Sequence, residues 1–198
     1  MRKLVVSTGN KNKLREIRDL LKGLDIEVLS KDQVGQADFD VVEDGESLEE
    51  NSRKKALGLF QEIGEMVIAD DSGLFVDYLD GAPGVHSARY SGLHGDDEAN
   101  NRKLLKELEG VEYDLRRASF QTVISLVDQE GRVYEARGIC PGHIEFEARG
   151  RGGFGYDPLF RPDGYDKTFG ELDLELKNTI SHRYRAIVEL RKILEEIL

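Results

Sequence analysis

The segment KLVVSTGNKNKLREIRDLLKGL, residues 3–24, decides the fold of this chain. It begins with residues 3–7, whose apolar centre Leu4-Val5-Val6 is typical of a short buried strand. The run leads through a glycine turn into a stretch whose apolar residues recur at helical spacing: Leu14, Ile17, Leu20, Leu21 and Leu24. Gly23, near the end of that stretch, is a helix stop signal. A buried strand, a turn and an amphipathic helix together predict an α/β fold.

Strands and helices alternate along the rest of the chain, which has 198 residues. Further strands are predicted at residues 26–29, 66–69, 120–127 and 132–136, the last two joined as a hairpin. Further helices are predicted at residues 47–63, 96–109 and 186–197. The first of these helices opens with Ser47-Leu48-Glu49-Glu50, which has the S-x-x-E form of a capping box. Since no linker or repeat interrupts the pattern, we expect a single domain over residues 1–198, with a mixed twisted sheet and flanking helices.

Composition and charge limit the function. No apolar run approaches the roughly 20 residues that span a bilayer, and the N-terminus lacks the apolar stretch of a signal peptide. We therefore expect a cytoplasmic protein without membrane contact. The net charge of -11 argues against binding of nucleic acid, because such surfaces need clustered Lys and Arg. Cys140 is the single cysteine, and we interpret it as a small buried hydrophobic residue.

The turn STGNKNK, residues 7–13, is a candidate anion site. Backbone N–H groups at a strand-to-helix junction bind anions with the help of the helix dipole, and Lys13 lies one turn into the helix. The spacing differs from that of a P-loop. The alternative interpretation is a tight turn followed by a solvated lysine.

Carboxylates follow the predicted strand 66–69 directly. Asp70 and Asp71 would lie at the carboxyl end of this strand, where ligands bind in open α/β sheets. Their hard oxygens suit Mg²⁺, and a carboxylate beside the metal can accept a proton from an attacking water. Glu43 is a further carboxylate, in an irregular segment. The alternatives are an N-cap or turn for the aspartates and a solvated loop residue for Glu43.

The stretch GGFGYDP, residues 152–158, offers groups for a base. Its Gly and Pro residues favour close approach of the backbone, and Phe154 and Tyr156 present flat faces on which a base can stack. The alternative is that both rings are core residues beside a bend.

Three donors lie near the start of the last predicted helix. Lys177, His182 and Arg183 suit phosphate or the acceptor edge of a base. A basic residue early in a helix opposes the macrodipole, which favours a ligand there. The alternative is a polar helix face.

Together these stretches resemble the inosine triphosphate pyrophosphatases, house-cleaning enzymes that cleave non-standard purine nucleoside triphosphates (ITP, dITP, XTP) to the monophosphate and pyrophosphate. The motifs occur in the family's order: S-T-G-N-x-x-K at 7–13, E-N at 50–51, K-A at 55–56, A-D-D-S-G-L at 69–74, G-A-P-G-V-x-S-A-R-Y-S-G at 81–92, G-G-F-G-Y-D-P at 152–158 and K-N-x-I-S-H-R at 177–183. The resemblance covers essentially the whole chain. The departures, at residues 52–54 and 139–147, touch no candidate catalytic group.

The resemblance implies two lobes around a central nucleotide-binding cleft, a homodimer with contacts in the loop 82–92, and Mg²⁺ as cofactor, with Mn²⁺ as a substitute. It implies Glu43 and Asp71 as metal ligands, Asp71 also as proton acceptor, and Asp70 as a catalytic residue that supports them. The implied substrate-binding residues are Thr8, Gly9, Asn10, Lys13, Lys55, Ser72, Phe154, Gly155, Tyr156, Asp157, Lys177, His182 and Arg183.

Selectivity would come from the 6-position of the purine, where hypoxanthine and xanthine present an acceptor and adenine presents a donor. Donors of His182 or Arg183 would favour the former. Two alternatives stay open. One is a pyrophosphatase of the septum-inhibitor-like group, acting on modified pyrimidines. The other is a nucleotide-binding sensor without turnover, which would not need a proton acceptor such as Asp71 beside its metal.

Overall fold

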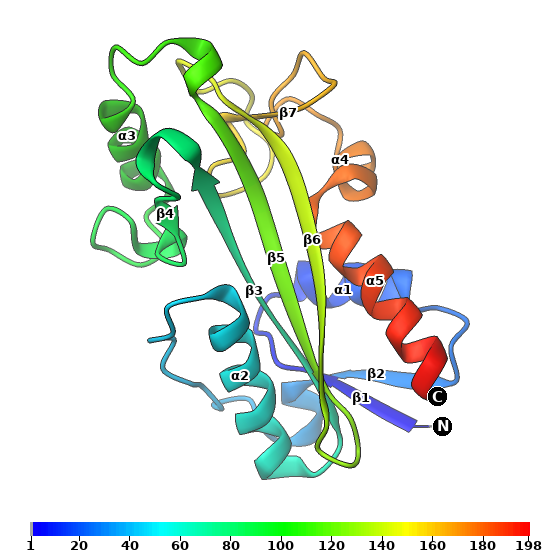
Figure 1. Cartoon of the computed structure of the whole chain (residues 1–198). Helices are drawn as coiled ribbons and strands as arrows, with labels where there is room; N and C mark the ends of the chain where they lie inside the picture. Colours follow the sequence, from blue (N-terminus) through cyan, green and yellow to red (C-terminus); the bar gives the residue numbers. More distant parts are fainter. Residues whose placement is uncertain (1) are drawn as a thin grey trace. The chain divides into compact units, whose positions relative to one another are not determined.

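The computed structural model describes residues 2–198, which form two compact units. Unit 1 consists of the described residues up to Asp71 together with Thr122–Gly138 and Arg185–Leu198. Unit 2 consists of Ser72–Gln121 and Ile139–Tyr184. The elements that pass from one unit into the other are β3 (Met66–Val76), β5 (Arg117–Val127), β6 (Val133–Ile144) and α5 (His182–Ile197), all labelled in Figure 1.

The sheet of unit 1 has the strand order β2-β1-β3-β5-β6. Strand β1 (Arg2–Val6) pairs in parallel with β2 (Ile26–Ser30) on one side and with β3 on the other. In this register Val6 lies opposite Ser30 and opposite Ile68. The three parallel segments therefore end at one level, and the residues that follow them share one edge of the sheet.

Side chains of β1 and β3 alternate between two cores in unit 1, as the pleat of a strand requires. One core contains Leu4, Val6 and Ile68 and is covered by α1 (Lys11–Leu20) and by the unit 1 part of α5. The other contains Val5 and Val67 and is covered by α2 (Leu48–Ile63). Figure 1 shows α2 on one side of these strands and α1 and α5 on the other. Since the strands are apolar on both faces, a helix layer covers each face.

Unit 2 continues the strands in the order β4-β3-β5-β6-β7, with β4 (Pro83–Gly84) and β7 (Phe160–Pro162) at the edges. Its helices are α3 (Asp97–Glu107) and α4 (Leu174–Ile180). Single turns of 3₁₀ helix form at Lys31–Val34 in unit 1 and, in unit 2, at Asp77–Leu79, Ser87–Arg89 and Tyr113–Leu115. The core of unit 2 includes Cys140, which is buried as predicted. The predicted α/β class with a mixed sheet is confirmed.

Strand β3 is longer than predicted. It does not end at Ala69 but runs to Val76, so Asp70 and Asp71 lie inside a strand. Beyond the level where its pairing with β1 ends, β3 pairs with β4. Gly73 makes this close approach possible, because a Cβ there would lie 2.4 Å from the carbonyl oxygen of Gly84. The alternative of N-cap or turn aspartates is therefore wrong.

Two helix predictions also need correction. Only half of the predicted capping box forms: Ser47 Oγ accepts from Glu50 N at 3.2 Å, but the Glu50 carboxylate accepts from Glu46 N instead of Ser47 N. Of the three donors predicted near the start of the last helix, His182 and Arg183 open α5, but Lys177 lies in the last turn of α4, where the macrodipole favours a cation. Within residues 2–198, no helix has the length and apolar character to cross a membrane.

Candidate functional site

The turn after β1 is organised by its own side chains. Thr8 Oγ1 accepts from Asn10 N at 3.1 Å, and Asn10 Oδ1 accepts from Lys13 N at 3.2 Å, as an N-cap residue does. The Lys13 ammonium then reaches Asp70 Oδ2 at 2.6 Å. A Cβ at Gly9 would meet no atom within 4 Å, so no steric conflict requires glycine there. Lys13 is thus a fixed cation and not a solvated lysine.

The predicted metal carboxylates converge on Lys55. Its Nζ lies 3.2 Å from Glu43 Oε1 and 3.4 Å from Asp71 Oδ1. The side chains of Lys55 and Asp71 are largely buried, with 14% and 13% of their surface exposed. Since Lys55 comes from α2 and Asp71 from β3, packing of this helix on the sheet brings the group together.

Asn51, to which the sequence assigned no role, fixes Asp71. Its side chain is 1% exposed; Nδ2 donates to Asp71 Oδ2 at 3.1 Å, and Oδ1 accepts from Gly45 N at 2.8 Å. A Cβ at Gly45 would lie 2.6 Å from that Oδ1, so glycine is required for this bond. Asn51 therefore ties Asp71 to the segment that carries Glu43.

Burial and the neighbouring charges shift the pKa of Asp71 and that of Lys55. Burial raises the pKa of Asp71, and the nearby Glu43 and Asp70 raise it further, against the opposing effects of Lys55 and Asn51. Burial alone would lower the pKa of Lys55, but the three carboxylates outweigh burial and raise it. The ammonium of Lys55 therefore stays charged and holds negative groups together that would otherwise repel one another.

The geometry of these side chains bears on whether they can bind a divalent metal. No three His, Cys, Asp or Glu side chains in the described part of the chain are grouped closely enough to hold a metal ion by themselves. Glu43 and Asp71, however, both face the Lys55 ammonium, so their oxygens already converge on one cation. Mg²⁺ is commonly bound by one or two carboxylates together with phosphate oxygens and waters. The pair therefore fits a metal that arrives with a phosphorylated ligand.

Lys13, Glu43, Lys55 and Asp70, but not Asp71, line one cavity of unit 1 with a volume of about 190 Å³. Its lining residues are Ser7, Thr8, Gly9, Lys13, Lys31, Phe39, Asp40, Val41, Glu43, Lys55 and Asp70. The volume is below the roughly 300–1,000 Å³ of a site that encloses a whole ligand of drug size. With its three lysines, the cavity suits phosphate groups.

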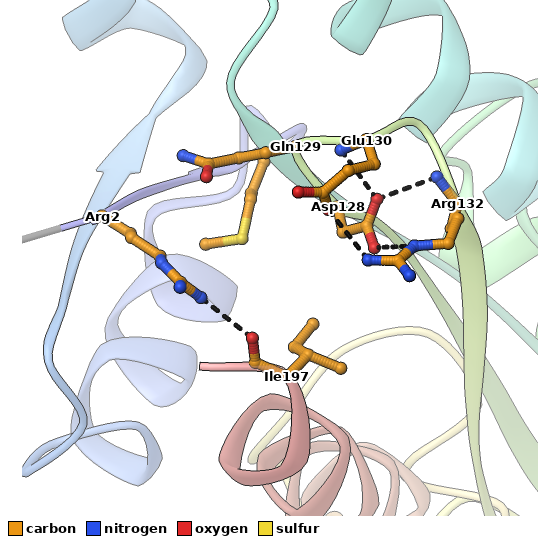
Figure 2. Close-up of a pocket in the computed structure, with 7 residues that line it drawn as sticks. Arg2, Asp128, Gln129, Glu130, Arg132 and Ile197 are labelled. Atoms are coloured by element: carbon orange, nitrogen blue, oxygen red, sulfur yellow. Dashed lines mark hydrogen bonds and ion pairs between the residues drawn. The ribbon is translucent and has the colours of Figure 1, made fainter.

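A second cavity of unit 1, about 90 Å³ in volume, shares no lining residue with the first. Figure 2 shows the residues that line it. Arg2 donates there to the carbonyl oxygen of Ile197 at 2.9 Å, and Arg132 Nε donates to Asp128 at 2.8 Å. Asp128 also accepts from Tyr134. The charged side chains of this cavity thus hold the hairpin turn and the end of α5 in place. We therefore assign no ligand to the cavity.

In unit 2 the predicted residues gather around Phe154. Its ring is 55% exposed, so Phe154 is not a core residue. Lys177 Nζ lies 4.9 Å and Arg183 Cζ 5.8 Å from the centre of the ring. The Lys177 ammonium also forms an ion pair with Asp157, whose Oδ2 accepts from Phe154 N at 2.8 Å. An exposed ring with two cations close to it is a suitable platform for an anionic ligand that carries a base.

The other predicted residues of unit 2 are less open. Tyr156 is 4% exposed and donates to the carbonyl oxygen of Ser87 at 2.8 Å, so its ring belongs to the core, as the alternative interpretation held. His182 is buried and stacks on Phe120 with 4.8 Å between ring centres. Ser72 is half-buried in β3.

Helix α3 braces the loop that carries Phe154, which the sequence did not indicate. The N–H of Gly155 donates to Asp97 Oδ2 at 2.7 Å, and the carbonyl oxygen of Gly155 accepts from Asn101 Nδ2 at 2.9 Å. Asp97 and Asn101 lie four residues apart and therefore on one helix face, a weak signal on its own. The loop is thus held on both sides of Gly155.

Comparison with known proteins identifies relatives over the full length. The profile of the Ham1 family matches residues 4–193. The dITP/XTP pyrophosphatase of Desulforamulus reducens is 48% identical, over 98% of this chain and 96% of that protein. The dITP/XTP pyrophosphatase of Clostridium perfringens is 47% identical over the whole of both chains.

Solved structures agree. A HAM1 protein from Coxiella burnetii has a TM-score of 0.92 at 36% identity, covering 99% of this chain and 100% of that one. The Ham1 protein of Staphylococcus aureus has a TM-score of 0.90 at 37% identity, over the whole of both chains. Sequence and structure lead to the same conclusion, and this chain belongs to the Ham1 family.

Proposed function

We propose that this chain hydrolyses the non-standard purine nucleoside triphosphates ITP, dITP and XTP to the nucleoside monophosphate and pyrophosphate, with Mg²⁺ as cofactor. The observation that carries the proposal is the cavity in which Lys13 and Lys55 meet the carboxylates of Glu43 and Asp70, next to Asp71. Relatives named dITP/XTP pyrophosphatase, 48% identical over nearly the whole chain, support the activity and the substrate class.

Asp71 is assigned as the proton acceptor for the water that attacks the α-phosphorus. Asn51 donates to one of its oxygens and Lys55 faces the other, so the carboxylate is oriented before substrate arrives. When bound between Glu43 and Asp71, Mg²⁺ would supply positive charge to the phosphates and to the attacking water.

The lysines serve the phosphates. In the free protein the ammonium groups of Lys13 and Lys55 are neutralised by the carboxylates of Asp70, Glu43 and Asp71. Phosphate oxygens can take over these ion pairs, so the lysines offer their charge where the reaction builds up negative charge. Positioning and charge stabilisation of this kind supply most of the catalysis in phosphoryl transfer.

Unit 2 is assigned to the base. Phe154 offers its exposed face for stacking, while Asp157 and Lys177 hold the loop and the ring in place. Donors of His182 and Arg183 would select a purine with an acceptor at the 6-position. Tyr156 supports the loop from the core instead of touching the base.

Three broader assignments belong to the same proposal. The two units act as one catalytic domain, because the chain passes between them inside β3, β5, β6 and α5 and not through a linker. The enzyme is a homodimer, with contacts in the loop 82–92. It works in the cytoplasm, where the nucleotide pool that it would cleanse is found.

A panel of nucleoside triphosphates with Mg²⁺, analysed for pyrophosphate and orthophosphate, tests the proposal. ITP should give IMP and pyrophosphate in one step. Formation of IDP and orthophosphate would contradict attack at the α-phosphorus. Preference for modified pyrimidines would favour the septum-inhibitor-like alternative, and tight binding without turnover would favour a sensor.

A further inference from the structure

Lys31 lies at the ligand-binding edge of the sheet, although no motif includes it. The parallel strands β2, β1 and β3 are level at Ser30, Val6 and Ile68. Lys31 follows Ser30 directly, just as the anion-binding turn follows β1 and the aspartates follow the parallel part of β3. In open α/β sheets, ligands bind outside the carboxyl ends of parallel strands. The topology therefore brings Lys31 to the edge that carries the site.

The contacts of Lys31 place it in the same cavity. It lines that cavity together with Lys13 and Lys55, and it is half-buried. Its Nζ donates to the carbonyl oxygen of Phe39 at 2.6 Å, which holds the ammonium against the cavity wall. Phe39 itself lines the cavity. The ammonium is therefore restrained at a wall of the cavity and does not extend into bulk solvent.

The three lysines of the cavity differ in how their charge is balanced. Lys13 and Lys55 each have carboxylate partners, at 2.6 Å and at 3.2 Å. Among the described residues, no carboxylate oxygen lies within ion-pair distance of Lys31 Nζ, whose partner is a neutral carbonyl. The positive charge of Lys31 is therefore left for an anion that enters the cavity.

We propose that Lys31 binds phosphate oxygens of the pyrophosphate group that leaves the substrate. This deepens the proposed function and rests on it. In that reaction water forms a bond to the α-phosphorus, Asp71 takes a proton from the water, and the bond from the α-phosphorus to the bridging oxygen breaks. The electron pair of the broken bond goes to pyrophosphate, which gains negative charge.

The assignment to the leaving group follows from where carboxylates lie. In the proposed function, attack at the α-phosphorus takes place beside Asp71, whose carboxyl lies near enough to Glu43 and Asp70 for their charges to raise its pKa. Of the three cavity lysines, Lys31 is the one with no carboxylate of the described residues 2–198 within ion-pair distance, so we assign to it the two phosphates that are not attacked. At the two phosphates that are not attacked, the charge of Lys31 stabilises the leaving group. It does not compete with the metal for the carboxylates of Glu43 and Asp71.

The experiment measures binding of inorganic pyrophosphate and of IMP by calorimetry, both with saturating Mg²⁺, and steady-state hydrolysis of ITP. The variants are Lys31→Met, which removes the charge, and Lys31→Arg, which keeps it. The matched control is Lys103→Met, because Lys103 also donates to a backbone carbonyl, that of Tyr90 at 2.8 Å, but lies outside the cavity. This control reports the effect of losing a lysine-to-carbonyl bond away from the cavity, together with the ion pair to Glu107 at 3.8 Å and the contact with the Tyr90 ring at 4.1 Å.

Lys31→Met should weaken pyrophosphate binding by roughly tenfold, since hydrogen bonds to charged groups are the stronger ones, while IMP binding stays the same. Lys31→Arg should recover most of the lost affinity, and Lys103→Met should bind both ligands as the unaltered protein does. Pyrophosphate affinity unchanged in Lys31→Met, with the melting temperature also unchanged, overturns the proposal. Equal losses for pyrophosphate and IMP overturn it too, because they indicate a structural role. If the unaltered protein binds pyrophosphate but leaves ITP intact, the proposed function fails, and the pyrophosphate comparison still decides the binding role of Lys31.

Discussion

Replacement of Phe154 by alanine tests whether its ring binds substrate or belongs to the core. Truncating a fully buried Phe costs about 3–5 kcal/mol of stability. Phe154 is 55% exposed and contacts two cations, at 4.9 and 5.8 Å from its ring. Exposed cation–π contacts contribute about 0.5–1 kcal/mol each, so Phe154→Ala should lower the free energy of unfolding by only about 1–2 kcal/mol.

Phe154→Ala should also weaken the binding of substrate. Stacking of a base on an aromatic ring contributes about 1–3 kcal/mol, which corresponds to a weakening of ITP binding by roughly 5- to 150-fold. We expect the KM for ITP to rise accordingly. The measurement combines steady-state kinetics with thermal denaturation of the same preparation.

Phe146→Ala is the matched control for this experiment. Phe146 is 60% exposed and has the guanidinium of Arg116 at 4.7 Å from its ring, but it lies outside the proposed site. Both variants should lose similar stability, and only Phe154→Ala should lose affinity for ITP. An unchanged KM in Phe154→Ala, with a melting temperature far below that of Phe146→Ala, would refute the assignment and place the ring in the core.

Three further changes test the remaining assignments. Asp71→Asn should lower single-turnover hydrolysis of ITP by at least about 10²–10⁴-fold, the usual contribution of a general base, and near-normal turnover would remove Asp71 from that role. Asn51→Ala removes the hydrogen-bond partner of both Gly45 N and Asp71. It should therefore cost about 1–3 kcal/mol of stability and lower kcat more than it raises KM. An unchanged kcat would show that Asp71 needs no positioning. Burial alone would raise the pKa of Asp128, but hydrogen bonds from Arg132 and Tyr134 outweigh it and lower the pKa. Since a depressed pKa stabilises the fold above the unfolded value of 3.8, Asp128→Asn should lower the melting temperature at pH 7, and the difference should shrink as the pH falls below about 4. A difference independent of pH would contradict that.

The sequence predicts the fold well where buried residues recur at a regular spacing along the chain. The segment 3–24 predicts β1 and α1 because both faces of β1 are covered and one face of α1 is apolar. The extension of β3 to Val76 was not predictable, because β3 pairs there with strands from separate segments, and the close contact of Gly73 with Gly84 is part of that pairing. Short edge elements such as β4 and β7 were missed for the same reason.

Some residues of the candidate site could likewise be predicted from the sequence, and others could not. Asp70 and Asp71 could be found because they follow an apolar run, and Lys13 because it follows a turn. Asn51 and Lys31 could not, since their importance lies in partners from other segments: Gly45 and Asp71 for Asn51, and the wall at Phe39 for Lys31. A residue type with many uses, such as Asn or Lys, becomes informative only when its neighbours in space are known.

The opposite environments of Phe154 and Tyr156 show what local sequence leaves open. In an extended chain, two rings that lie two residues apart would point to the same side. The pattern alone therefore suggests that both rings are exposed or that both are buried. Gly153 and Gly155, however, have φ of +77° and +59°, the left-handed region that favours glycine. The chain therefore turns on each side of Phe154, and its ring stays exposed while that of Tyr156 enters the core. At Gly153 a Cβ would also lie 2.0 Å from Asp157 Oδ2, the atom that accepts from Phe154 N, so the same glycine that turns the chain makes room for the carboxylate that holds the exposed ring in place.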